Sequence, residues 1–94
     1  MYLLRPVRAA MADAPTAAEG EVLAAHFAYL ERLRDEGRLI VAGPSIVPGD
    51  TFGLVVLEVA DEAEALAAME ADPAIAGGLM SAQLRPLRLS VVRS

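Results

Sequence analysis

The chain has 94 residues, of which 55% are hydrophobic and none is cysteine, and its formal net charge is −5 at pH 7. This length suits one compact domain over residues 1–94, and the absence of cysteine excludes disulfides and thiolate metal sites. An acidic chain without a basic stripe is not expected to bind nucleic acid, and no apolar run reaches the ~20 residues of a membrane span, so we expect a soluble protein. The absence of cysteine fits a redox-neutral location, and we therefore expect a cytoplasmic protein.

The first predicted elements are a short strand and a long helix. Residues 2–4 are apolar and predict a buried strand, which ends near a proline because proline cannot donate to a central ladder. Thr16 and Glu19 have the spacing of a capping box, which predicts a helix that begins near residue 17. We expect this helix to end at Gly37.

The only histidine of the chain, His26, lies on the apolar side of this predicted helix. Histidine is the side chain whose charge ordinarily changes near neutral pH. A polar ring on an apolar face must find a buried polar partner or line a cavity. At about 100° per residue, the residues that share its side of the helix are Val22, Leu23, Phe27, Leu30 and Leu33.

The rest of the chain predicts two more strands, a helix and a final strand. Residues 39–42 and 52–59 are apolar runs bounded by turn residues, which is typical of strands. Asp61 and Glu64 mark the start of a helix over residues 62–71, with an inner side expected to carry Ala63, Leu66 and Ala67. The last extended segment is predicted from an alternation of Leu87, Leu89 and Val91 with Arg88, Ser90 and Val92.

The order β-α-β-β-α-β predicts an α+β, ferredoxin-like fold, in which a four-stranded antiparallel sheet carries both helices on one face. The run from residue 52 to 59 is apolar on both sides, so the bare face of the sheet should also be covered. The same face of a second copy would cover it most simply. We therefore expect a homodimer that packs sheet to sheet.

This topology predicts that polar residues distant in the sequence meet at one end of the sheet. His26 lies early in the first helix, and Asp72 follows the second helix at the same edge. Ser45 and Phe52 flank the connection between the second and third strands, and Arg5 ends the first strand. Polar groups that converge between apolar walls are typical of a small-molecule pocket.

Four segments of the chain, in order, resemble the YCII-related (YciI-like) family of the dimeric α/β-barrel superfamily, over nearly the whole length. They are Leu4-Arg5-Pro6 with Arg8, His26-Phe27-Ala28-Tyr29-Leu30, Gly37-Arg38-Leu39 with Ala42-Gly43-Pro44, and Ala71-Asp72-Pro73-Ala74-Ile75 with Gly78. The resemblance implies an active-site pair of His26 and Asp72. Members of the family include a dehydrochlorinase of chlorinated hydroxyquinol breakdown, and the wider superfamily includes muconolactone isomerases.

Chemically, a carboxylate that accepts a hydrogen bond from the N–H of one imidazole nitrogen fixes the tautomer and leaves the other nitrogen as a base. His26 and Asp72 are thus the candidate catalytic residues of a lyase or isomerase acting on a small cyclic or anionic metabolite. Ser45, Arg5 and Phe52 are the candidate substrate-binding residues, because a hydroxyl and a guanidinium bind substrate oxygens. One histidine and no cysteine leave a zinc or iron site short of ligands, and no glycine-rich phosphate loop is present, so we expect neither metal nor cofactor.

Each candidate also has a structural interpretation. His26 is equally explained as a hydrogen-bonded core residue, and Asp72 before Pro73 has the pattern of a helix N-cap. Ser45 suits an ordinary turn and Arg5 a solvated strand end. The functional alternative to an enzyme is a non-catalytic small-molecule-binding or accessory dimer.

Overall fold

The computed structural model of the protein describes residues 1–8, 14–46, 50–88 and 90–91. Within them the chain forms seven elements, which are the six in the predicted order and one additional short helix before the last strand. They are β1 (Tyr2–Pro6), α1 (Ala17–Asp35), β2 (Leu39–Pro44), β3 (Gly53–Leu57), α2 (Glu62–Ala71), α3 (Pro73–Ala76) and β4 (Met80–Leu84).

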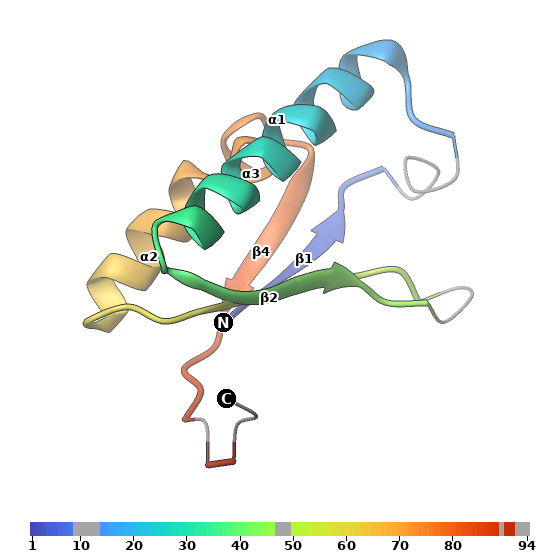
Figure 1. The fold of residues 1–94 in the computed structure, drawn as a ribbon. Helices are drawn as coiled ribbons and strands as arrows, with labels where there is room; N and C mark the ends of the chain where they lie inside the picture. The colour runs from blue at the N-terminus through green and yellow to red at the C-terminus, as the bar shows by residue number, and fades with distance from the viewer. Residues whose placement is uncertain (9–13, 47–49, 89, 92–94) are drawn as a thin grey trace.

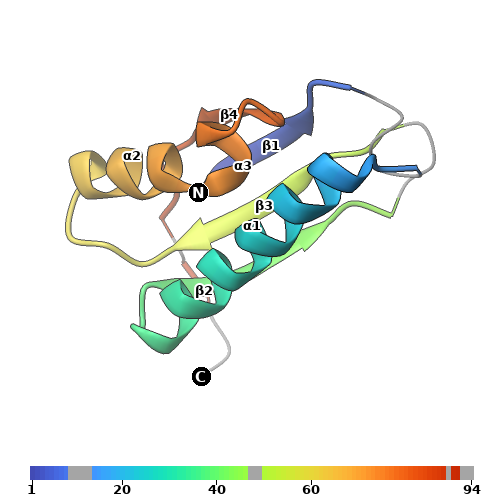
Figure 2. The same ribbon diagram turned by 90° about the horizontal axis from the view of Figure 1, so that it is seen from above.

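The four strands form one antiparallel sheet in the order β2-β3-β1-β4. This is the ferredoxin-like arrangement, which confirms the predicted fold class. Figures 1 and 2 show the three helices on the same side of this sheet. The strand β1 is therefore covered by helices on one face, and its residues there belong to the core.

The core lies between the sheet and the helices. Tyr2 and Leu4 on β1 are 0% and 2% exposed, because alternate residues of a strand point to the same face. The other buried members of this cluster are Tyr29, Leu30, Leu33, Val55 and Met69. Three of them belong to α1, so the packing of this helix against the sheet determines where its other side chains point.

The start of α1 is fixed by the predicted capping box. Thr16 Oγ1 accepts from the backbone N–H of Glu19, and the Glu19 carboxylate accepts from the backbone N–H of Thr16. Glu19 also binds the guanidinium of Arg8. These bonds, with Arg8 first, lower the pKa of Glu19 to about 2. Arg8 is thus engaged in anchoring α1, the helix on which His26 lies.

The predicted inner face of α2 was wrong. Its buried residues are Ala65, Ala68 and Met69, whereas Leu66, which we expected inside, is 41% exposed. The helix carries apolar residues at most positions, so no single stripe orients it. Its rotation is instead set by tertiary contacts, among them the hydrogen bond from the Tyr29 hydroxyl to the carbonyl of Ala68 at 2.7 Å.

The last strand was predicted too late in the chain. β4 spans Met80–Leu84, follows Gly78 in a left-handed conformation with φ of +72°, and pairs with β1 from Pro6↔Met80 to Tyr2↔Leu84. This segment alternates apolar and polar residues as clearly as the predicted one at residues 87–92, and Pro86 prevents the strand from continuing. Leu87 is 49% exposed and in no strand, and Leu89 and Val92 lie outside the described residues.

Candidate active site

Asp72 lies between two helices and is completely buried, with an exposure of 0%. It caps α3, because its Oδ1 accepts the backbone N–H of Ala74 at 2.9 Å and Pro73 occupies the first position of that helix. The predicted N-cap is therefore confirmed. Pro73 lacks the N–H that would otherwise be unsatisfied there, so the local sequence explains why the chain turns at this aspartate.

His26 lies in the third turn of α1 and is 5% exposed. Its Nδ1 is 2.7 Å from Oδ1 of Asp72. The packing of α1 beside α3 brings these two residues together although they are 46 positions apart in the chain. Because Nδ1 is bonded to a carboxylate acceptor, it is the nitrogen that carries the proton in the neutral ring, and Nε2 is left as the basic nitrogen.

The second oxygen of Asp72 is held by Tyr2, whose hydroxyl donates to Oδ2 at 2.8 Å. Burial raises the pKa of Tyr2 far above its usual range, and the charge and hydrogen bond of Asp72 raise it further. The phenol therefore stays protonated and remains a donor. The carboxylate accepts three hydrogen bonds in total, which compensates for its removal from water.

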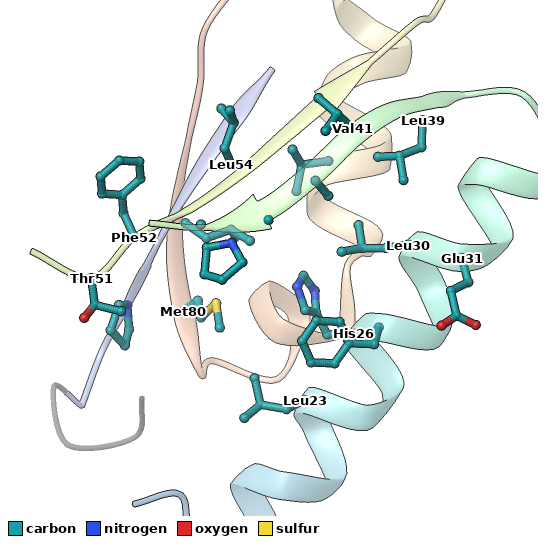
Figure 3. Close-up of a pocket in the computed structure, with 18 of the residues that line it drawn as sticks. Leu23, His26, Leu30, Glu31, Leu39, Val41, Thr51, Phe52, Leu54 and Met80 are labelled. Carbon is teal, nitrogen blue, oxygen red and sulfur yellow. The ribbon is translucent and has the colours of Figure 1, made fainter. Parts of the chain in front are cut away.

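A cavity of about 600 Å³ lies beside His26. In Figure 3, Leu23, His26, Leu30 and Met80 lie between α1 and the sheet, whereas Leu54 and Val41 point to the opposite side. Among the residues that line this cavity, His26, Glu31 and Arg34 carry titratable side chains, and most others are aliphatic. An apolar cavity with one imidazole at its wall suits a small ring or chain that presents a single polar group to Nε2.

The predicted substrate-binding residues are distributed unevenly around this cavity. Phe52 is one of the residues that line it, whereas Arg5 and Ser45 are not. Arg5 pairs with Asp50 at 3.2 Å and places its guanidinium 5.4 Å from the centre of the Phe52 ring. Ser45 Oγ donates to the carbonyl of Asp50 at 2.7 Å and accepts from the N–H of Phe52 at 3.0 Å. Both residues therefore contact Phe52 and do not line the cavity.

Two residues of the site were missed by the sequence analysis. Tyr2 was assigned only to a buried strand, and no local signal in the sequence connects it with Asp72. Phe27 was expected on the inner side of α1, but it is 57% exposed and its ring lies 5.4 Å from that of His26, at the edge of the cavity. The apolar spacing alone could not show that His26 points inward and Phe27 outward, because adjacent residues of a helix differ in direction by only about 100°.

No group of three or more potential His, Cys, Asp or Glu metal ligands occurs in the part of the chain that the structure describes. None of the helices in those same ranges is long and apolar enough to span a bilayer.

Comparison with known proteins identifies related sequences and structures. The model of the YCII-related domain matches residues 4–87. Among solved structures, the chain is similar to 5-chloro-2-hydroxyhydroquinone dehydrochlorinase from Burkholderia phenoliruptrix, in complex with 2,5-dihydroxybenzoquinone. The two share 24% sequence identity over 92% of this chain and 94% of the other, with a TM-score of 0.60. A search of curated proteins found no match. The structural likeness independently supports the ferredoxin-like fold.

Proposed function

The chain belongs to the YCII-related domain family, and on this basis and that of the site geometry we propose that it is a lyase or isomerase. In this proposal His26 and Asp72 form an acid/base pair that acts on a small cyclic or anionic metabolite. The observation that carries the proposal is the 2.7 Å bond between Nδ1 and Asp72 in a histidine that also lines the cavity.

The proposed chemistry begins with proton removal by Nε2 of His26. The electron pair of the broken bond to hydrogen then forms a new π bond. In an elimination, the leaving group departs with the electrons of its own bond. In an isomerisation, the imidazolium returns the proton at another carbon. Asp72 favours the proton removal because its charge stabilises the imidazolium that forms.

The residues predicted to bind substrate take different roles in this proposal. Phe52 is among the residues that line the cavity, but its ring points to the same side of the sheet as Leu54, away from His26 (Figure 3). Arg5 contacts the ring of Phe52, and Ser45 accepts from its backbone N–H. Their effect on binding would therefore be indirect.

The experiment that tests the proposal is a turnover assay on chlorinated hydroquinones and on unsaturated lactones. The first class is suggested by the similar solved structure, which is that of a dehydrochlorinase. Chloride release measures elimination, and hydrogen-deuterium exchange at carbon in heavy water measures proton removal alone. We expect the protein to accelerate at least one of these reactions over buffer. Binding without either reaction would instead support the alternative, a non-catalytic binding or accessory dimer.

We also propose that the protein is a homodimer in which the open faces of two sheets pack together. The face opposite the helices carries Leu3, which is paired with Leu54 across the ladder, and Val41, which is 53% exposed. Within the described residues, all the helices lie on the other side of the sheet and none covers this face (Figure 1). Apolar side chains that cluster on an open sheet are typical of an interface.

A charge in the centre of this face should break the dimer. We expect Leu3→Asp to give a monomer in size-exclusion chromatography with light scattering, because an unpaired carboxylate would be buried in the interface. The matched control is Leu66→Asp, on the exposed side of α2, which should leave the dimer intact. A wild-type protein that is monomeric at micromolar concentration would contradict this proposal.

A further inference from the structure

Two tyrosines are buried in the core, and only the hydroxyl of Tyr2 donates to a charged group. The Tyr29 hydroxyl donates to a backbone carbonyl, that of Ala68. The Tyr2 hydroxyl donates to Oδ2 of Asp72, the same carboxylate whose Oδ1 binds His26. The two residues bonded to Asp72 come from different elements, Tyr2 from β1 and His26 from α1. Asp72 itself lies at the turn between α2 and α3.

We propose that Tyr2 is a positioning residue of this site, whose hydroxyl moderates the attraction of Asp72 for the Nδ1 proton of His26. A donor on Oδ2 draws negative charge from the carboxylate and so weakens Oδ1 as an acceptor. Tyr2 thereby adjusts how readily His26 takes up a proton at Nε2. The proposal rests on the proposed acid/base function, but its effect is on the ring itself and exists without substrate.

The buried position of Tyr2 supports this role over one of space filling. Tyr2 is 0% exposed and lies on a strand with neighbours on both sides. A phenylalanine would fill nearly the same volume there, so filling space does not by itself require the hydroxyl. The hydroxyl lies close to a buried charge, in surroundings where water screens little. Its hydrogen bond to Oδ2 should therefore have a larger effect on the charge of Asp72 than a similar bond at the surface.

The other charged groups near the imidazole of His26 are the same in the wild type and in Tyr2→Phe, the variant that tests this role. Glu31 and Arg34 line the cavity from α1 itself, and Asp72 faces the ring from the turn before α3. Tyr29 also lies on α1, but its hydroxyl donates to the carbonyl of Ala68 and not to Asp72. None of these groups is altered by removing the Tyr2 hydroxyl, so their contributions cancel between wild type and Tyr2→Phe.

The test is nuclear magnetic resonance of the imidazole, which is unambiguous because the chain has a single histidine. In Tyr2→Phe we expect the Nδ1 proton to move downfield, as a stronger hydrogen bond requires. At one fixed pH near neutrality, the ratio of charged to neutral ring, read from the ¹⁵N shifts, should rise about threefold. The control Tyr29→Phe should leave both signals at their wild-type values. A Tyr2→Phe spectrum equal to that of wild type or of Tyr29→Phe would overturn the proposal.

A second measurement keeps the hydroxyl and so avoids any loss of folding. The chain has two tyrosines, so fluorotyrosine incorporated in the Tyr29→Phe background labels Tyr2 alone. The fluorinated phenol is more acidic and a stronger donor, and the charged fraction of His26 should therefore fall relative to Tyr29→Phe. An unchanged ratio would contradict the proposal even if the protein proves to be active. A changed ratio in a protein without turnover would support the role of Tyr2 and reject the proposed function alone.

Discussion

Replacement of Asp72 by alanine is expected to lower the free energy of unfolding by about 3–5 kcal/mol. The variant removes the acceptor of three hydrogen bonds, from the Tyr2 hydroxyl, the His26 ring and the backbone N–H of Ala74. All three groups would be left without a partner in a buried position. Urea unfolding at one protein concentration measures the difference, since the stability of an oligomer depends on concentration.

Asp61 provides a matched control for this variant. It is also an N-cap aspartate, and its side chain accepts from the N–H of Glu64 at 2.8 Å, but it lies at the exposed start of α2. Asp61→Ala should cost about 1 kcal/mol, the ordinary value of a helix cap. Equal losses in the two variants would show that Asp72 acts as a cap alone, and that its bonds to Tyr2 and His26 contribute nothing to stability.

Replacement of His26 by glutamine is expected to lower kcat by about 10²–10⁴-fold on any substrate that the wild type turns over. An amide can occupy a similar volume and donate to Asp72, but it cannot accept a proton at neutral pH. KM should change little, because the apolar walls of the cavity remain. Steady-state kinetics of wild type and variant, with chloride release or deuterium exchange as the readout, measure the effect.

The control for this prediction is Tyr29→Phe, which removes a buried hydroxyl of the same helix that does not line the cavity. Its kcat should stay within a few-fold of wild type, and both proteins should unfold cooperatively. A His26→Gln variant that keeps its activity would assign the imidazole to the core. A variant that loses activity only because it fails to fold would show a loss of cooperative unfolding as well.

The elements that the sequence predicted are those with local signals. Thr16 with Glu19, and Asp61 with Glu64, are caps whose partners lie three residues away, so the helix starts could be placed without tertiary information. The strand at residues 80–84 was missed because two neighbouring segments alternate equally well. Only the ladder with β1 decides between them, and that ladder is a long-range contact.

The candidate site was predictable to the extent that topology determines it. The order of elements brings α1 and the end of α2 to one edge of the sheet, which is why the proximity of His26 and Asp72 was expected. The third member, Tyr2, depends on the register of β1 and on the short helix α3, and neither could be derived from spacing. The positions of Arg5 and Ser45 depend on Asp50, which precedes Phe52. Its carboxylate pairs with Arg5, and its backbone carbonyl accepts from Ser45.

A crystal structure of the protein with 2,5-dihydroxybenzoquinone, the compound bound in the similar solved structure, tests the proposed site most directly. We expect the ring in the cavity between α1 and the sheet, with an oxygen within hydrogen-bonding distance of Nε2 of His26 and the Nδ1 bond to Asp72 retained. A compound bound elsewhere, or a cavity closed by side chains around the imidazole, would contradict the assignment of His26 as the acid/base residue.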